Sequence, residues 1–316
     1  MIGYVLRRLL WAVVTVWFAV SAVFAMLMWI PADPARTLVG PRADVETVAR
    51  ARAAYCLDDS FLEQYGCFVG RLARGDMGES FRSQRPVSAI IGERLWATAQ
   101  LALAAMILQL ALALPLGLWA AVRRNRRADY LATGIAIIGQ SAPTFFIGLI
   151  LMYLGGYQLG WFPIAGYGEG LGGRLHHLAL PAATLAVVGA AYYTRLLRSE
   201  MIEVLDADYM RTARAKGLPE RIVVAKHGLR NGLGPVITLI GLDIGVLMAG
   251  AVVTEHIFAW PGLGREVLSA VLDADIPLIL GVVVVTSAVI AVANLIADVA
   301  NAWLDPRVRQ GALAGR

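Results

Sequence analysis

Long apolar stretches separated by polar segments dominate the 316-residue chain. Six stretches are each long enough to cross a bilayer, which takes roughly 17–25 residues of helix. They cover residues 9–30, 96–122, 131–154, 178–197, 236–253 and 276–299. The first follows Arg7 and Arg8, but its apolar run exceeds the roughly 7–15 residues of a signal peptide, so it is expected to be retained. The pattern predicts an all-α polytopic membrane protein with six transmembrane helices.

Polar residues interrupt several of these stretches or border them. Inside a membrane such residues usually face a bundle interior or a water-filled cavity. Gln109 interrupts the second stretch. The candidates for a translocation path or gate are Gln140, Asp243, Glu255, Asn294 and Asp298. The alternative is that these residues only stabilise packing between helices. This alternative is favoured for Asp298, whereas for Asp243 the packing role and the functional role are equally favoured.

Composition and charge support a membrane location. Hydrophobic residues make up 58% of the chain and charged residues 16%, whereas a soluble domain is about a quarter charged. Of the 28 Lys and Arg residues, 17 fall in the N-terminus, in the segments around 123–127 and 195–230, and in the C-terminal tail. The positive-inside rule therefore places both termini in the cytoplasm. Topology accounts for the basic charge, so no nucleic-acid partner is expected.

The predicted domains follow this topology. Residues 1–30 are the cytoplasmic N-terminus and first span, 31–95 an extracytoplasmic subdomain with one short helix over 42–55, 96–305 a five-helix core, and 306–316 a cytoplasmic tail. Cys56 and Cys67 lie in the subdomain, where an oxidising exterior permits a disulfide; two free thiols are the alternative. Residues 155–177 form a predicted glycine-rich loop, and the amphipathic run within 258–277 predicts an interfacial or re-entrant helix.

The largest cytoplasmic segment, residues 198–231, is predicted to contain two short helices. Residues 200–216 favour a helix with Met201, Leu205, Tyr209 and Ala213 on one face, and Gly217-Leu218-Pro219 ends it. A solvated connector is one interpretation. A simple connector needs few residues, so the length favours the other interpretation, an element that docks into a partner's groove.

Motifs for catalysis are not found in the sequence. It has no G-x-x-x-x-G-K-[ST] nucleotide-binding loop, no H-E-x-x-H metal motif and no G-x-S-x-G nucleophile elbow. We therefore expect a non-catalytic protein with no metal or cofactor of its own.

Several motifs in order resemble one family. The segment Glu203-Val204-Leu205 to Asp208-Tyr209-Met210-Arg211-Thr212-Ala213-Arg214-Ala215-Lys216-Gly217-Leu218, with His227-Gly228-Leu229-Arg230-Asn231, resembles the cytoplasmic EAA loop of bacterial ABC importer permeases. Ser141-Ala142-Pro143-Thr144-Phe145-Phe146 and Glu255-His256-Ile257-Phe258-Ala259-Trp260-Pro261-Gly262-Leu263-Gly264 agree with this likeness. The chain is most similar to B-type permease subunits of dipeptide and oligopeptide importers.

The resemblance implies a fold, partners and site residues. It implies the type I ABC importer permease fold in the bacterial inner membrane, and half of a path for di- or oligopeptides. The implied partners are a second homologous permease in a heterodimer, two ATPase subunits that bind ATP and Mg²⁺, and an extracytoplasmic binding protein. The implied coupling residues are Glu203, Tyr209, Arg211, Ala213, Arg214, Ala215, Lys216, Gly217 and Leu218.

Other functions stay open at the level of sequence. A related importer for nickel, haem or another small solute would share this permease type. A proton-coupled secondary carrier using Asp243 and Glu255 is less favoured because it leaves residues 198–231 unexplained. A scaffold that only recruits partners is a third interpretation.

Overall fold

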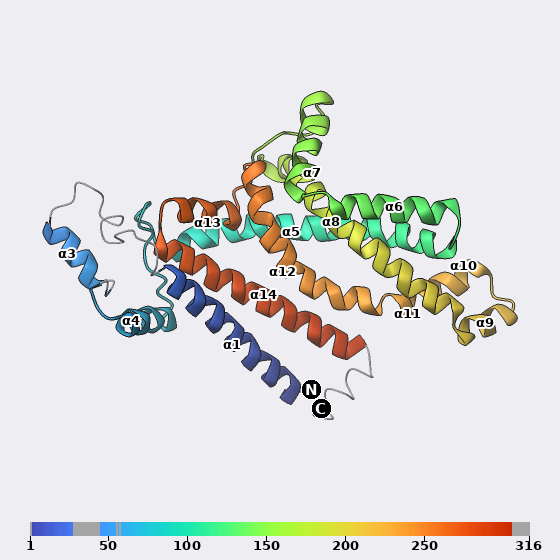
Figure 1. Cartoon of the computed structure of the whole chain (residues 1–316), viewed down its shortest axis with the longest axis horizontal. Helices are drawn as coiled ribbons and strands as arrows, with labels where there is room; N and C mark the ends of the chain where they lie inside the picture. Colours follow the sequence, from blue (N-terminus) through green and yellow to red (C-terminus); the bar gives the residue numbers. More distant parts are fainter. Residues whose placement is uncertain (1, 28–44, 55, 57, 305–316) are drawn as a thin grey trace. The chain divides into compact units, whose positions relative to one another are not determined.

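The computed structural model describes residues 2–27, 45–54, 56 and 58–304 (Figure 1). Within these residues the regular elements are helices, and Glu79 and Pro86 form an isolated β-bridge. The helices are α1 (Ile2–Leu27), α3 (Val45–Ala54), α4 (Phe61–Ala73), α5 (Val87–Val122), α6 (Arg127–Ser141), α7 (Thr144–Leu151), η1 (Met152–Gln158), α8 (Gly170–Asp206), α9 (Asp208–Ala215), α10 (Glu220–Ile222), η2 (Val223–Leu229), α11 (Arg230–Gly232), α12 (Gly234–Ile257), α13 (Leu263–Leu272) and α14 (Ile276–Leu304).

The chain separates into two compact units. Unit 1 comprises Met1–Arg7, Ala99–Trp260 and Ala293–Arg316, and unit 2 comprises Arg8–Thr98 and Pro261–Val292. Unit 2 thus contains the predicted extracytoplasmic subdomain together with α13 and the first part of α14. The predicted tail 306–316 and the end of the first predicted span lie outside the described residues.

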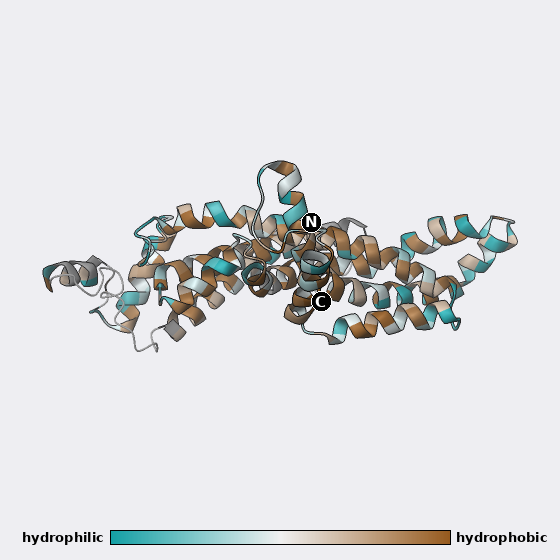
Figure 2. Ribbon diagram, turned by 90° about the horizontal axis from the view of Figure 1, so that it is seen from above, coloured by the Kyte–Doolittle hydropathy of each residue, from teal (hydrophilic) through white to brown (hydrophobic). Residues whose placement is uncertain are grey.

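The helical membrane architecture predicted from hydropathy is confirmed. Four helices are long and apolar enough to cross a membrane, in the segments Leu6–Met26, Val87–Val122, Gly170–Asp206 and Ile276–Ala297. Two bent pairs, Arg127–Ser141 with Thr144–Gln158 and Glu220–Gly232 with Gly234–Met248, raise the number to six if each pair counts as one span. The long helices are predominantly apolar along their length (Figure 2).

The third predicted span is not a continuous helix. Its two halves, α6 and α7, meet at an angle of 104°. Pro143 lacks an N–H, and the residue before a proline is pushed away from helical angles; Ala142 is accordingly extended, with φ −81° and ψ 135°. Pro115 and Pro181 lie inside the continuous helices α5 and α8. Of Pro115, Pro143 and Pro181, only Pro143 coincides with a break in a predicted span.

The glycine-rich loop is shorter than the predicted range 155–177. Residues 152–158 are helical, and α8 already begins at Gly170. A Cβ at position 155 would lie 3.2 Å from a methyl carbon of Leu180, and one at position 156 would lie 2.9 Å from Ile164. These glycines permit close packing rather than a flexible loop, which is why their number misled the prediction.

Unit 2 contains a helix that the sequence analysis missed. Helix α4 begins after Ser60, where Ser60 and Glu63 form a capping box. Phe24 of α1 packs against the rings of Phe61 and Phe68 at centroid distances of 5.8 and 5.3 Å. A disulfide joins Cys67 of α4 to Cys56, with 6.6 Å between their Cα atoms.

A buried carboxylate fixes the start of α14 in unit 2. Asp275 is 1% exposed. It accepts hydrogen bonds from the Ser80 hydroxyl, from the backbone N–H of Phe81 at 3.1 Å and from that of Leu278 at 3.3 Å. The carboxylate thus serves both as the cap of the helix and as an anchor for residues 80–81, nearly 200 positions earlier in the chain.

Candidate functional site

Unit 1 carries the cytoplasmic element predicted over residues 198–231. The prediction of one continuous helix over residues 200–216 is wrong, because these residues belong to two helices. Helix α8 continues to Asp206, Ala207 is extended with ψ 149°, and α9 follows. Asp208 begins α9, where an acidic side chain interacts favourably with the helix dipole. Polar residues gather at this end of α8 and on α9 (Figures 1 and 2).

The break at Ala207 changes which residues of α9 are buried. Met210 is fully buried, Ala213 is 7% exposed, and both pack with buried Val223 of η2. Tyr209, which the sequence pattern placed on the same face as Ala213, is 45% exposed. An uninterrupted helical period would have kept Tyr209 in line with Met201, but the extended residue at 207 rotates α9 relative to α8.

Gly217 makes the turn between α9 and α10 as predicted. Its φ is +76°, in the left-handed region that glycine adopts at little cost. Its N–H donates to the Arg214 carbonyl at 2.9 Å. A Cβ at this position would meet no atom within 4 Å. Glycine is therefore favoured at position 217 by the backbone conformation and not by lack of space.

Arg214 braces the turn from within. Its guanidinium donates to Glu220 of α10, with Nη2 to Oε1 at 2.9 Å and Nε to Oε2 at 3.1 Å. Nη1 also donates to the Leu205 carbonyl at the end of α8, at 3.4 Å. The hydrogen bond to Glu220 raises the pKa of the Arg214 guanidinium. Arg214 thus ties together α8, α9 and α10.

The remaining predicted coupling residues are at the surface of the element. Three large apolar side chains are exposed there, Tyr209 at 45%, Leu218 at 37% and Ile222 at 38%. We call these three the docking face, after the docking role that the sequence predicts for this element. The other exposed predicted residues are Glu203, Arg211, Arg214, Ala215, Lys216 and Gly217. The sequence analysis did not identify Ile222, because a three-residue helix has no detectable periodicity.

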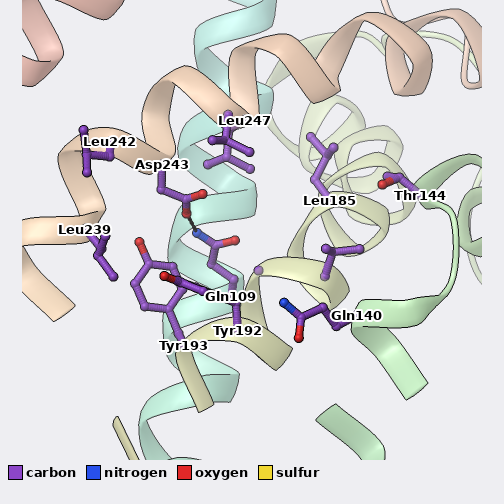
Figure 3. Close-up of a pocket in the computed structure, with 13 residues that line it drawn as sticks. Gln109, Gln140, Thr144, Leu185, Tyr192, Tyr193, Leu239, Leu242, Asp243 and Leu247 are labelled. Atoms are coloured by element: carbon purple, nitrogen blue, oxygen red, sulfur yellow. Dashed lines mark hydrogen bonds between the residues drawn. The ribbon is translucent and has the colours of Figure 1, made fainter. Parts of the chain in front are cut away.

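A second candidate site in unit 1 is a pocket among the long helices, with a volume of about 350 Å³ (Figure 3). Buried Gln109 of α5 donates through Nε2 to Oδ2 of Asp243 on α12. The hydroxyl of Tyr193, on α8, points toward the same carboxylate (Figure 3). The full lining is Gln109, Gln140, Thr144, Leu185, Val188, Gly189, Tyr192, Tyr193, Leu239, Leu242, Asp243, Val246 and Leu247.

Close packing of α8 against Gln109 depends on one glycine. A Cβ at position 189 would lie 1.7 Å from Gln109 Oε1, far inside any allowed contact. The missing side chain of Gly189 therefore provides the space that the Gln109 amide occupies beside Asp243. Neither Gly189 nor Tyr193 was identified from sequence, because their role depends on contact with residues on other helices.

The structure brings only some of the predicted path residues together. Gln140 and Asp243 line the same pocket, and Gln140 accepts a hydrogen bond from Arg195 at 2.7 Å. Glu255 is fully buried and does not line this pocket. Asn294 is also outside the lining, and its Oδ1 has no hydrogen-bond partner among the described residues. The Asp298 side chain lies outside the described residues.

An ion pair that the sequence did not predict joins α6 to α8. Asp129 is 2% exposed, and it accepts both Nε and Nη2 of Arg198, the latter at 2.8 Å. The Asn125 N–H also donates to Asp129, at 2.9 Å. Paired charges separated by 69 residues have no signature in a sequence. This pair fixes the end of α8 that leads to the cytoplasmic element.

Two family models match the chain. The model described as "Binding-protein-dependent transport system inner membrane component" matches residues 113–310, and "Binding-prot-dependent transport system membrane comp, N-term" matches residues 1–102. The chain is 39% identical over 309 residues to the glutathione transport system permease protein GsiC of Salmonella typhimurium (strain LT2), covering 98% of this chain and 99% of that protein. It is 38% identical to the Escherichia coli (strain K12) protein of the same name, with the same coverage.

A solved structure shares the fold. The chain is similar to a subunit in an inward-facing structure of the MetNI methionine ABC transporter, with a TM-score of 0.58 and 15% identity, over 68% of this chain and 96% of that one. At this identity the likeness concerns the fold alone.

Proposed function

Because the chain belongs to the family of binding-protein-dependent transport system inner membrane components, we propose that it forms half of a translocation path for di- and oligopeptides. It is the permease subunit of a bacterial ABC importer, a multi-pass inner membrane protein that is not itself catalytic. ATPase subunits, which bind ATP, and a binding protein are its partners. A proton-coupled carrier is inconsistent with membership of this family.

The single observation that carries the choice of solute is the similarity to permeases named for glutathione transport. Glutathione is a tripeptide, and the identity of 39% extends over 98% of this chain. A peptide is therefore the solute class that we propose, with nickel, haem and other small solutes as the alternatives that the experiment below must separate.

We further propose that residues 198–231 couple ATP hydrolysis to transport. The docking face of Tyr209, Leu218 and Ile222 offers exposed apolar contacts to an ATPase subunit. The Arg214 brace and the buried Met210 cluster make the element move as one body. Closure of an ATPase dimer would then move this body and rock the attached helices between inward- and outward-open states.

The pocket around Asp243 supports a path shared with a second permease. Leu242 and Val246 of its lining are 56% and 67% exposed in this chain, so another subunit can cover that side. We propose a homologous but different chain as this subunit, and both termini in the cytoplasm as the charge distribution favours.

Reconstitution tests the proposed function. The chain is purified with its co-purifying subunits, placed in vesicles with ATP on the cytoplasmic side, and supplied with the binding protein outside. Accumulation of labelled dipeptide or glutathione, dependent on both ATP and the binding protein, is the expected result. Uptake restricted to nickel or haem would contradict the proposed solute. Uphill transport by the chain alone, without nucleotide, would contradict the whole assignment.

A further inference from the structure

An ionisable residue lies near the middle of a membrane helix in unit 1. Asp243 is the tenth of the 24 residues of α12, so it lies about 14 Å along the helix axis at 1.5 Å per residue. The described ion pairs do not include Asp243. A carboxylate at this depth is costly without a partner, and such residues commonly mark a substrate pathway.

The surroundings of Asp243 form a pocket with an apolar wall and a polar end. Leu185 and Leu247 are each 5% exposed and contribute to the wall, while Gln109 and Tyr193 lie beside the carboxylate (Figure 3). The volume of about 350 Å³ is at the lower end of the roughly 300–1,000 Å³ of small-molecule sites. It suits one end of a short peptide better than an entire oligopeptide.

Two buried polar side chains lie next to Asp243. The Tyr193 side chain is 1% exposed and Gln109 is fully buried. The Tyr193 hydroxyl points toward the Asp243 carboxylate and interacts with it (Figure 3), whereas Gln109 Oε1 has no hydrogen-bond partner among the described residues. Buried polar groups are rarely left unpaired, and a bound molecule is one explanation. Gln109 Oε1 can accept a hydrogen bond, as can the carboxylate.

The chemistry of these acceptors selects the ligand. A primary ammonium group carries three N–H donors and one positive charge. A carboxylate and an amide oxygen match both properties. Gln109 Nε2 donates hydrogen bonds to Asp243 Oδ2 and to the Met106 sulfur, the latter at 3.2 Å. Because the Gln109 amide is uncharged, it orients the Asp243 carboxylate but does not neutralise the negative charge.

We propose that this pocket binds the positively charged α-amino group of the peptide during translocation, with Asp243 as the contact and Gln109 as a positioning residue. This inference rests on the proposed function, because it concerns the solute that the importer carries. Gly189 is part of the same site, since it alone allows the Gln109 amide to lie there. Exchange of the ammonium between the pocket and water keeps binding weak enough for release.

A thiol placed in the pocket tests the proposal without the binding protein. Thr144 lines the pocket and is partly buried. The chain contains two cysteines, and they are joined to each other, so Thr144→Cys introduces the one free thiol of this chain. In the assembled importer, its modification by a cationic and by an anionic methanethiosulfonate reagent is followed on the permease band.

The ratio of the two rates reports the charge of the site. Replacing Asp243 by Asn in the same reporter chain should lower the cation-to-anion rate ratio by about tenfold or more. Asp243→Glu keeps the charge and should keep the preference. A dipeptide with a free amino group should slow modification, whereas its N-acetylated counterpart should not. Co-purification of the ATPase subunits verifies that each variant assembles.

The outcomes separate this proposal from the function on which it rests. An unchanged rate ratio in Asp243→Asn overturns the proposal, because a cation from a second permease or a bound proton then already neutralises the carboxylate. Equal protection by the acetylated peptide also overturns it. If either result accompanies normal peptide uptake by the unmodified importer, only the subsite is wrong. If the unmodified importer takes up no peptide, the proposed solute itself is wrong, whatever the thiol assay shows.

Discussion

Replacing Gly217 by proline should abolish uptake without preventing membrane insertion. The φ of +76° at this position is inaccessible to proline, whose ring holds φ near −65°. Proline would also remove the N–H that donates to the Arg214 carbonyl at 2.9 Å, a bond worth about 0.5–1.5 kcal/mol. The turn must therefore adopt another path, and α9 and α10 lose their relative orientation.

Two further variants at position 217 should reduce uptake to intermediate extents. A Cβ at position 217 would meet no atom within 4 Å. The free-energy cost of Gly217→Ala is therefore that of the left-handed conformation alone, roughly 1–2 kcal/mol. That cost corresponds to about a 5–30-fold smaller share of correctly formed turn. Asparagine tolerates the same conformation and is the matched control. The expected order of uptake is glycine, asparagine, alanine and then proline.

The assay is ATP-dependent peptide uptake in membrane vesicles, normalised to the amount of permease in the membrane. Pull-down of the ATPase subunits in parallel shows whether docking is lost. Wild-type uptake by Gly217→Pro would refute the role of the turn. Alanine and asparagine variants that are equally impaired would contradict the role of backbone conformation, because asparagine tolerates the left-handed region better than alanine does.

Three other predictions follow from buried contacts. Gly189→Ala should displace the Gln109 amide and lower the free energy of unfolding by about 1.5–3 kcal/mol, the worth of a hydrogen bond to a charged group; an unchanged thermal midpoint would contradict this. Asp275→Ala removes a buried acceptor of several hydrogen bonds and should cost on the order of 3 kcal/mol, whereas Asp275→Asn, measured by the same unfolding, should cost less. Maleimide labelling of the native chain should modify neither Cys56 nor Cys67 before reduction and both after it, and labelling without reduction would argue against the disulfide.

Features that depend on local sequence were predictable. The length of the apolar stretches indicated membrane helices because the bilayer thickness sets the length of a spanning helix. The turn at Gly217 was predictable because a left-handed residue ending a helix is a local property of glycine. Pro143 carried the signal for the break between α6 and α7, but Pro115 and Pro181 carry the same signal inside continuous helices.

The contacts between helices were decided only by the tertiary structure. Gln109 and Asp243 lie 134 positions apart, and α5 and α12 are apolar on all sides, so no periodicity indicates which faces meet. The extended residue at 207 turns Tyr209 outward, although an uninterrupted helical period would align it with buried Met201. The chain's sequence therefore determined which segments are long and apolar enough to cross a membrane and where the turn at Gly217 lies. Packing in three dimensions determined which polar groups share the pocket. Helices that are equally apolar on every face carry no pattern that fixes their rotation about their own axes, so this rotation is set only by the contacts in the folded chain.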